Sequence, residues 1–323
     1  MPDHAPPTAE GIRAAYAAID PVFLDTPLIE HPSTDAELTC KLLVKVETLN
    51  PIRAFKGRGT YWFLANLPSS GQRLVAASAG NFGQGLARAA QKRGRALTMF
   101  ASIHANPLKI EAMQRFGAEM ILAGEDFDAA KDAARAFAAQ HGHLYVEDGA
   151  HREVAEGAGT IALEMTRDLA RRRASVDTIL VPLGNGALLT GVGTWFRHAV
   201  PGCRVIGVVA EVAPSMLLSW QQGRQTSTAT ASTIADGIAV REPIPYALAC
   251  MRSTVDDVWT VSEASIRAGM RFCHRHYGLV VEPAGAAGVG AVLEHGARLA
   301  GQRVATILCG GNMTAEQVAE VLG

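Results

Sequence analysis

The sequence predicts an α/β protein whose open, mostly parallel sheets carry helices on both faces. Two observations lead to this fold class. Short apolar runs alternate along the chain with amphipathic helical patterns, which is typical of parallel sheets built from strand–helix–strand units. The chain also has 323 residues, more than one hydrophobic core usually holds, so we expect two lobes with a cleft between them.

The expected elements follow one another as such a fold requires. An apolar run at 74–77 is typical of a strand, and the small residues of 80–85 turn the chain into a helix. Other strand-like runs lie at 96–101, 120–122, 178–183, 205–209 and 304–308. We expect the strand at 120–122 to be buried. The Thr- and Ser-rich segment 225–233 is expected to form an exposed, mobile loop.

The composition argues against nucleic-acid and membrane partners. The 30 Lys and Arg residues nearly balance the 31 Asp and Glu residues, so no net field would attract nucleic acid or an anionic membrane. No apolar stretch is long enough to span a bilayer, and the N-terminus lacks the basic and apolar segments of a signal peptide. The cysteines are scattered without a CxxC pair, which favours reduced thiols and a cytoplasmic setting. They are Cys40, Cys203, Cys250, Cys273 and Cys309.

Lys56 is the first candidate for chemistry. A lone lysine is most often a solvated surface group. Here Phe55 precedes it, and Gly57 and Gly59 follow, which suggests an amine held against an apolar wall. Such a wall favours the uncharged, nucleophilic amine that bonding to a carbonyl group requires.

Two strand-to-helix turns of small residues, 78–85 and 181–188, are candidate anion sites. Backbone N–H groups at the positive end of a helix suit a carboxylate or a phosphate. Taken alone, each turn is equally well a tight connection whose glycines serve geometry. The second turn has Leu189 where the dinucleotide motif needs its third glycine, and it lacks the Gly-Lys-Ser/Thr of a P-loop. A smaller phosphorylated cofactor therefore fits better than a nucleotide.

Cys309 closes the apolar run 304–308, ahead of Gly310 and Gly311. A lone cysteine is usually a small core residue. At the carboxyl end of a strand, however, its side chain would face the crevice in which open α/β sheets bind ligands.

Together these four segments, in this order, resemble the fold-type II pyridoxal-phosphate (PLP) family, particularly its threonine/serine dehydratases (ammonia-lyases) and serine racemases. Further matching stretches extend the resemblance to almost the whole chain, at 26–28, 159–164, 235–240 and 281–285. The resemblance implies a two-lobed fold like that of the tryptophan synthase β-subunit, with PLP in the cleft, and a homodimer. We assign 1–40 and 143–323 to a large cofactor-binding domain and 41–142 to a small domain.

The resemblance also implies a role for each candidate. Lys56 is similar to the family's Schiff-base lysine, which also removes the Cα proton, although Ala54 stands where the family has serine. Asn81 is similar to the asparagine that contacts the cofactor's 3-hydroxyl group. Cys309 stands where the family places a serine or cysteine against the pyridine nitrogen. The residues implied to bind PLP are Phe55, Lys56, Asn81, Gly184, Asn185, Gly186, Ala187, Leu188 and Cys309. Those implied to bind substrate are Ser78, Ala79, Gly80, Asn81 and Gly237.

These roles imply an ammonia-lyase that converts a β-hydroxy amino acid, such as threonine, serine, 3-hydroxyaspartate or phenylserine, to a 2-oxo acid and ammonia. Ala79 replaces the second serine that returns a proton to Cα in racemases, so racemisation is not expected as the main activity. The neutral thiol of Cys309 makes the pyridine ring a weaker electron sink and favours prompt β-elimination. The alternatives are a racemase, a β-replacement enzyme or a non-catalytic PLP-binding protein, and the last of these would not need Lys56.

Arg53 is a candidate for substrate specificity, and Glu211 is a candidate for metal binding. Arg53 is either a surface or interlobe residue, or it enters the pocket and binds an acidic substrate side chain through a bidentate pair. Glu211 alone is a poor ligand set for a hard cation that takes roughly six or more oxygens, so we expect no metal site. The chain ends at Gly323, and we expect no appended regulatory domain of the kind found in biosynthetic threonine dehydratases.

Overall fold

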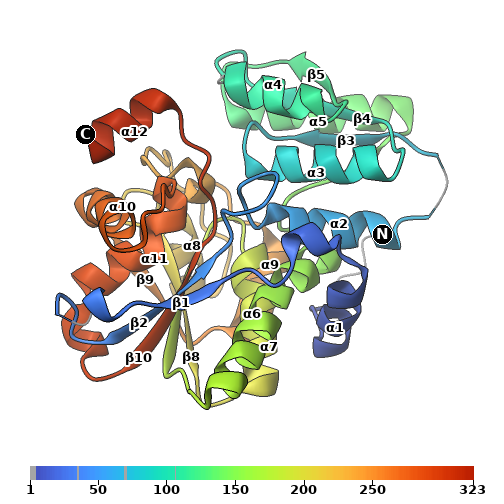
Figure 1. The fold of residues 1–323 in the computed structure, drawn as a ribbon. Helices are drawn as coiled ribbons and strands as arrows, with labels where there is room; N and C mark the ends of the chain where they lie inside the picture. The colour runs from blue at the N-terminus through green and yellow to red at the C-terminus, as the bar shows by residue number, and fades with distance from the viewer. Residues whose placement is uncertain (1–4, 35, 69–70, 106) are drawn as a thin grey trace.

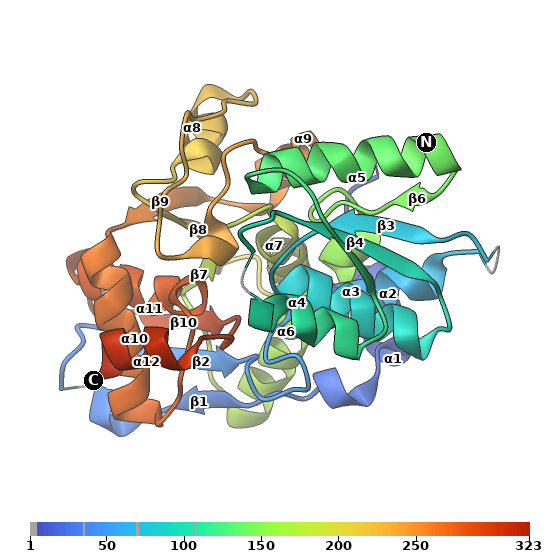
Figure 2. The ribbon, with the colours of Figure 1, turned by 90° about the horizontal axis from the view of Figure 1, so that it is seen from above.

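The computed structural model describes residues 5–34, 36–68, 71–105 and 107–323. Its two sheets lie in separate halves of the molecule (Figures 1 and 2). In the six-stranded sheet the order is β1-β2-β10-β7-β8-β9, and in the four-stranded sheet it is β5-β4-β3-β6. Every neighbouring pair is parallel except β1 with β2. The predicted α/β class with mostly parallel sheets is therefore confirmed.

Strands and helices alternate along most of the chain. The strands of the larger sheet are β1 (Leu28–Glu30), β2 (Lys41–Val46), β7 (Thr178–Pro182), β8 (Arg204–Ala210), β9 (Asp257–Val261) and β10 (Arg303–Leu308). Those of the smaller sheet are β3 (Leu74–Ala77), β4 (Leu97–Ala101), β5 (Glu119–Leu122) and β6 (Leu144–Tyr145). The first helices are α1 (Ala9–Ala18), α2 (Lys56–Asn66), α3 (Asn81–Lys92), α4 (Pro107–Arg115), α5 (Phe127–His141) and α6 (Arg152–Arg172). The later helices are α7 (Ala187–Ala199), α8 (Ser215–Gln222), α9 (Pro245–Thr254), α10 (Glu263–Tyr277), α11 (Pro283–Glu294) and α12 (Ala315–Leu322). Short 3-10 turns are η1 (Pro21–Phe23), η2 (Pro32–Thr34), η3 (Asp236–Ile238) and η4 (Gly296–Leu299).

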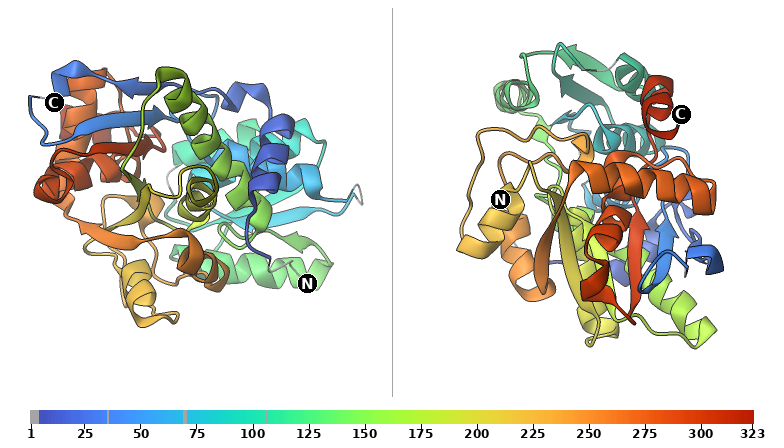
Figure 3. Two further views of the ribbon diagram at one scale, coloured as in Figure 1. Left: turned by 90° about the horizontal axis from the view of Figure 1, so that it is seen from below. Right: turned by 90° about the vertical axis from the view of Figure 1, so that its left-hand side faces the viewer.

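The larger sheet is buried on both faces, because its side chains alternate between two helical layers. Ile179 and Val181 of β7 pack with α6 and α7, whereas Leu180 between them packs with α10 and α11. Apolar side chains therefore occupy successive positions of the strand, as expected for a parallel sheet covered on both sides. Helix α1 packs on α6 and α7 (Figure 3).

The smaller sheet has the same sandwich arrangement but an open edge. Val75 of β3 packs with α5, and Leu74 packs with α2 and α3. Strand β5 forms the edge of this sheet, and Leu122 at its end is 51% exposed. The expectation of a buried strand at 120–122 is therefore wrong, because an edge strand has a neighbour on one side only.

Two strands lie in a different sheet from the one that the predicted domain ranges imply. Strand β2 pairs with β10 in the larger sheet, from Lys41 opposite Arg303 onward. Strand β6 pairs with β3 in the smaller sheet, with Leu144 opposite Leu74. The boundaries at 40/41 and 142/143 need correction at these strands, because the chain crosses between the halves later than predicted in both places. Residues 1–4 of the predicted large domain lie outside the described residues.

The segment 225–233 forms no helix or strand and is largely exposed, as the sequence predicts, and its mobility stays a prediction. In the part of the chain that the structure describes, no helix is both long and apolar enough to cross a membrane.

Candidate active site

The candidate residues lie where strands of both sheets end. Ser78 follows the last residue of β3, Cys309 follows β10, and the glycine-rich turn 184–188 begins just after β7. Carboxyl ends of parallel strands form the edge at which α/β sheets bind ligands. The Phe55 backbone N–H donates to the carbonyl of Cys309 at 3.0 Å, so the start of α2 is joined directly to the end of β10.

Lys56 is the first residue of α2, and its side chain is largely buried. Its Nζ lies 2.5 Å from Oδ2 of Asp148, and both side chains are 15% exposed. The amine also lies 4.9 Å from the ring centroid of Phe55 and 5.8 Å from that of Phe82, within or near the range of a cation–π contact. The aromatic wall expected beside Lys56 is thus present, together with a carboxylate that the sequence had not indicated.

Asp148 is a functional candidate that sequence reasoning missed. It lies between β6 and α6, and Asn185 of the glycine-rich turn donates from Nδ2 to the same oxygen, Oδ2, at 3.4 Å. The available signal was an acidic residue before Gly149, just after a strand. That strand, β6, has only two residues, so periodicity could not reveal it.

The turn 184–188 presents unpaired donors at the start of α7. Gly186 has φ +93°, and a Cβ there would lie 2.6 Å from Cβ of Ala247, so glycine is required. Among the described residues, none provides a hydrogen-bond acceptor for the backbone N–H groups of 185–188. These free donors at a helix N-terminus form a cradle suited to a phosphate group.

The loop after β3 is held in a tight turn beside open space. Ser78 Oγ accepts from the N–H groups of Gly80 and Gly83, at 3.1 and 3.2 Å, and so fixes the turn. A Cβ built on Gly80 would meet no atom within 4 Å, so there is room for a ligand above this residue. Ala79, between Ser78 and Gly80, carries no proton-donating side chain.

Gly237 packs directly against the glycine-rich turn. A Cβ on Gly184 would lie 2.8 Å from the carbonyl oxygen of Gly237, and a Cβ on Gly237 would lie 3.6 Å from Oε1 of Glu282. The structure therefore brings Gly237, a predicted substrate-binding residue, close to Gly184 and to the carboxyl group of Glu282.

Asn81 is held in a polar network with the buried carboxyl group of Glu282 and the partly buried Asn312. Its Nδ2 donates to Oε1 of Glu282 at 2.7 Å, and its Oδ1 accepts from Nδ2 of Asn312 at 2.8 Å. The backbone N–H of Asn312 donates to the second oxygen of Glu282 at 3.1 Å. Burial, with a smaller contribution from Asp236, raises the pKa of Glu282 to about 7. From the sequence, Glu282 lies in the family-like stretch 281–285, but no role is predicted for it.

The raised pKa of Glu282 predicts a pH-dependent stability. Between pH 4.5, the usual value for Glu, and about 7 the folded protein holds a proton that the unfolded chain releases, so stability falls as the pH rises through this range. We expect wild type to lose up to about 3 kcal/mol of unfolding free energy relative to Glu282→Gln between pH 4.5 and 7.5. Urea unfolding of both proteins across this range measures the difference. Stability curves that run parallel would contradict it.

Cys309 is buried at the end of β10, with its Sγ 3.8 Å from the carbonyl oxygen of Ala284. Burial raises the pKa of this thiol far above its ordinary value, with the charge of Glu282 acting in the same direction. The raised pKa keeps this thiol neutral.

Arg53 lies on a different surface. It is exposed, has a left-handed backbone conformation with φ +51°, and lines a groove of about 570 Å³ together with Met313, Val318 and Leu322 around α12. Its carbonyl accepts from the N–H of Gly311 at 2.9 Å. The structure places the Arg53 side chain with α12 and gives it no contact with Lys56, so its predicted part in substrate choice gains no support.

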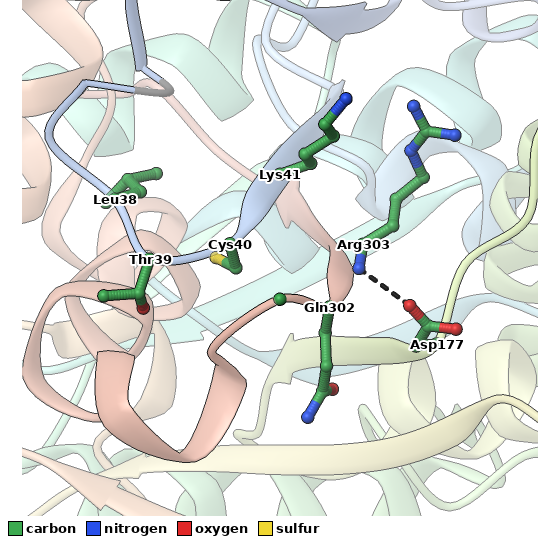
Figure 4. Close-up of a pocket in the computed structure, with 8 residues that line it drawn as sticks. Leu38, Thr39, Cys40, Lys41, Asp177, Gln302 and Arg303 are labelled. Atoms are coloured by element: carbon green, nitrogen blue, oxygen red, sulfur yellow. Dashed lines mark hydrogen bonds between the residues drawn. The ribbon is translucent and has the colours of Figure 1, made fainter.

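A second hollow, of about 460 Å³, lies at the opposite end of the larger sheet (Figure 4). It surrounds the amino ends of β2 and β10, where the backbone N–H of Arg303 donates to Oδ2 of Asp177 at 2.8 Å. None of the predicted site residues lines it. Within the described ranges there is also no group of three or more His, Cys, Asp or Glu side chains that could hold a metal ion.

The fold and the site define a class of protein that holds a small phosphorylated cofactor beside a lysine, between two α/β lobes. The chain belongs to the pyridoxal-phosphate dependent enzyme family, whose model matches residues 19–310. The family and fold type predicted from the sequence, and PLP as the cofactor, are therefore confirmed.

Relatives and solved structures extend this result over nearly the whole chain. An L-threonine ammonia-lyase from Thermotoga maritima is 34% identical over 98% of this chain and 78% of its own length. An L-threo-3-hydroxyaspartate ammonia-lyase from a Pseudomonas species is 30% identical over 92% of each protein. The crystal structure of a threonine deaminase from T.th. superposes with a TM-score of 0.90 at 32% identity, covering 95% of this chain and 99% of that one.

The residues present fit PLP. The free N–H groups of 185–188 suit its phosphate, the amine of Lys56 suits its carbonyl carbon, and the space above Gly80 leaves room for a ligand. The buried, neutral thiol of Cys309 suits an unprotonated pyridine nitrogen.

Proposed function

We propose that this protein is a PLP-dependent ammonia-lyase that converts a β-hydroxy amino acid to a 2-oxo acid and ammonia. One observation carries the proposal: the Lys56 amine lies in one cleft with the donor turn 184–188 and the loop 78–81, in a chain that aligns nearly end to end with ammonia-lyases. When bound, PLP supplies an electron sink for the charge that develops on Cα.

The chain's own side chains and backbone N–H groups would anchor the cofactor, bind the substrate and move the proton. We propose that Lys56 anchors the cofactor and takes the proton from Cα, with the N–H groups of 185–188 binding the phosphate. The N–H groups of Ala79 and Asn81 bind the substrate carboxylate, and the Asn81 side chain, held by Glu282, contacts the ring substituent. Phe55 and Phe82 help to exclude water around the amine.

Ala79 separates this proposal from racemisation. A racemase needs a second proton donor on the opposite face of Cα. The methyl group of Ala79 cannot supply one, at the position where the resemblance to racemases places a serine. We therefore propose elimination as the main outcome of Cα deprotonation.

The substrate is tested by measuring 2-oxo acid and ammonia release from L-serine, L-threonine, phenylserine and both diastereomers of 3-hydroxyaspartate. We expect release from at least one of them, with kcat at least about tenfold above the rate of racemisation of the same compound. Release from none of them would refute dehydration. Racemisation as the faster reaction would refute the argument from Ala79.

We also propose that the protein forms a homodimer in a reducing, cytoplasmic compartment. The compartment is supported by its five cysteines, all of which are buried and none of which forms a disulfide. The dimer rests on the family resemblance.

A further inference from the structure

Asp148 forms the one hydrogen bond of the Lys56 amine among the residues that the structure describes. Its Oδ2 lies 2.5 Å from the Lys56 Nζ, although 92 positions separate the two residues in the sequence. Both side chains are only 15% exposed. Solvent therefore screens this ion pair much less than a surface pair.

The backbone around Asp148 holds its carboxylate in place. Gly149 has φ +84°, and a Cβ there would lie 2.4 Å from the carbonyl oxygen of Asn185, so the Asp148 loop packs directly on the cofactor-binding turn. Asn185 also donates toward the Asp148 carboxylate at 3.4 Å. A side chain fixed in this way keeps its position when the amine beside it changes protonation state.

The neighbouring acid, Glu147, has a different task. Its Oε1 accepts from Lys131 at 3.0 Å and from Arg135 at 2.8 Å, which ties the loop to α5. Asp148 takes no part in that network. Its second oxygen, Oδ1, is buried and has no hydrogen-bond partner within the described residues. A buried, unpaired carboxylate oxygen is costly for structure alone, which points to a task in the cleft.

We propose that Asp148 is a positioning residue for Lys56, which holds the ammonium group that Lys56 becomes when it takes the substrate's Cα proton. This inference rests on the proposed function. In the step, the Cα–H bond breaks, an N–H bond forms on Lys56, and the electron pair stays with Cα. The proton remains on Nζ, and the Asp148 carboxylate accepts a charge-assisted hydrogen bond from it. The unpaired Oδ1 offers the ammonium a second acceptor.

The test compares Asp148→Asn, Asp148→Glu and Glu147→Gln in the PLP-loaded enzyme. Asparagine keeps the size of the side chain but removes its charge. We expect Asp148→Asn to lower kcat about 10- to 100-fold, with KM changed less than about threefold, and to enlarge the kinetic isotope effect of a substrate deuterated at Cα. Asp148→Glu restores at least part of the rate. Glu147→Gln, which weakens the same loop's ion pairs, stays within about twofold of wild type.

A second measurement uses the cofactor-free protein and no substrate. Labelling of Lys56 by an amine-specific reagent, read by mass spectrometry, should be about tenfold faster in Asp148→Asn than in wild type, because the Asp148 carboxylate no longer engages the amine in a charge-assisted hydrogen bond. An unchanged labelling rate would overturn the inference. So would an unchanged isotope effect, an equal loss in Glu147→Gln, or weaker PLP binding as the sole defect. If wild type releases no 2-oxo acid, the proposed function fails, and the labelling rates still decide whether Asp148 controls Lys56.

Discussion

Replacing Lys56 by alanine is expected to lower kcat for 2-oxo acid release by at least about a thousandfold. One substitution removes both the amine that anchors the cofactor and the base that takes the Cα proton, and a positioned base alone is worth about 10²- to 10⁴-fold. The variant should fold, because Asp148 alone loses an ionic partner and Asn185 still donates toward its carboxylate.

The covalent role is measured separately from the rate. After borohydride treatment, mass spectrometry of wild type should find PLP fixed to the peptide that contains Lys56, and the alanine variant should carry none. Lys92→Ala is the matched control, because Lys92 is exposed in the last turn of α3 and makes no contact with the cleft. PLP fixed to another lysine of wild type, or full activity in Lys56→Ala, would contradict the assignment.

The site was predictable wherever a short motif directly follows a strand. Ser78, Gly184 and Cys309 each stand at the carboxyl end of an apolar run. Gly184 and Cys309 follow neighbouring parallel strands of the larger sheet, whose carboxyl ends meet at one edge, whereas Ser78 follows β3 of the smaller sheet. The strand pattern therefore predicted that the first two segments meet, and the family resemblance predicted that the loop at Ser78 joins them.

The remaining features depend on tertiary contacts that no local pattern records. Asp148 reaches Lys56 only through the packing of its loop on Asn185. Glu282 stands in a matching motif, but its task became visible only with its bonds to Asn81 and Asn312. The sequence allows Arg53 to be either a surface residue or a substrate ligand, and only the structure shows it exposed on the surface beside α12.

Sheet assignment was limited in the same way. Strand β2 lies between the first helix and Lys56 in the sequence, and its apolar run does not show which sheet it joins. Hydrogen bonds to β10, from the far end of the chain, decide that. Strand β5 is apolar enough to suggest burial, but its place at the edge of a sheet leaves Leu122 half exposed.

Arg58→Met is expected to give the largest loss of stability among single substitutions near the site. The Arg58 side chain is fully buried two residues after Lys56, with its Nε 2.8 Å from Glu47 and its Nη1 2.6 Å from Glu164. Lys45 also contacts Glu164, at 2.7 Å. The two cations and two carboxylates balance, and they join the end of β2, helix α2 and helix α6 in one network.

Methionine in place of Arg58 would leave Glu47 buried without a counter-charge. Removing one partner of a buried pair typically costs about 3–5 kcal/mol, because the remaining charge stays desolvated. The pKa of Glu164 reports the same dependence: burial raises it, but Arg58 and then Lys45 hold it below its usual value. Its stabilising contribution is therefore present above the unfolded-state pKa and is lost as the pH falls through the lower folded-state pKa.

Arg73→Met provides the comparison, since it makes the same substitution in an exposed pair of the smaller sheet. Arg73 lies 2.5 Å from Glu119, but the two side chains are 35% and 58% exposed. Solvent screening limits such a pair to about 0–1 kcal/mol. Urea unfolding at pH 7 should therefore separate the two variants by at least about 2 kcal/mol. Equal losses would mean that the Arg58 network is no more stabilising than a surface pair. We also expect Arg58→Met to bind PLP more weakly than Arg73→Met does. The reason is that the Arg58 network fixes helix α2, which begins at Lys56.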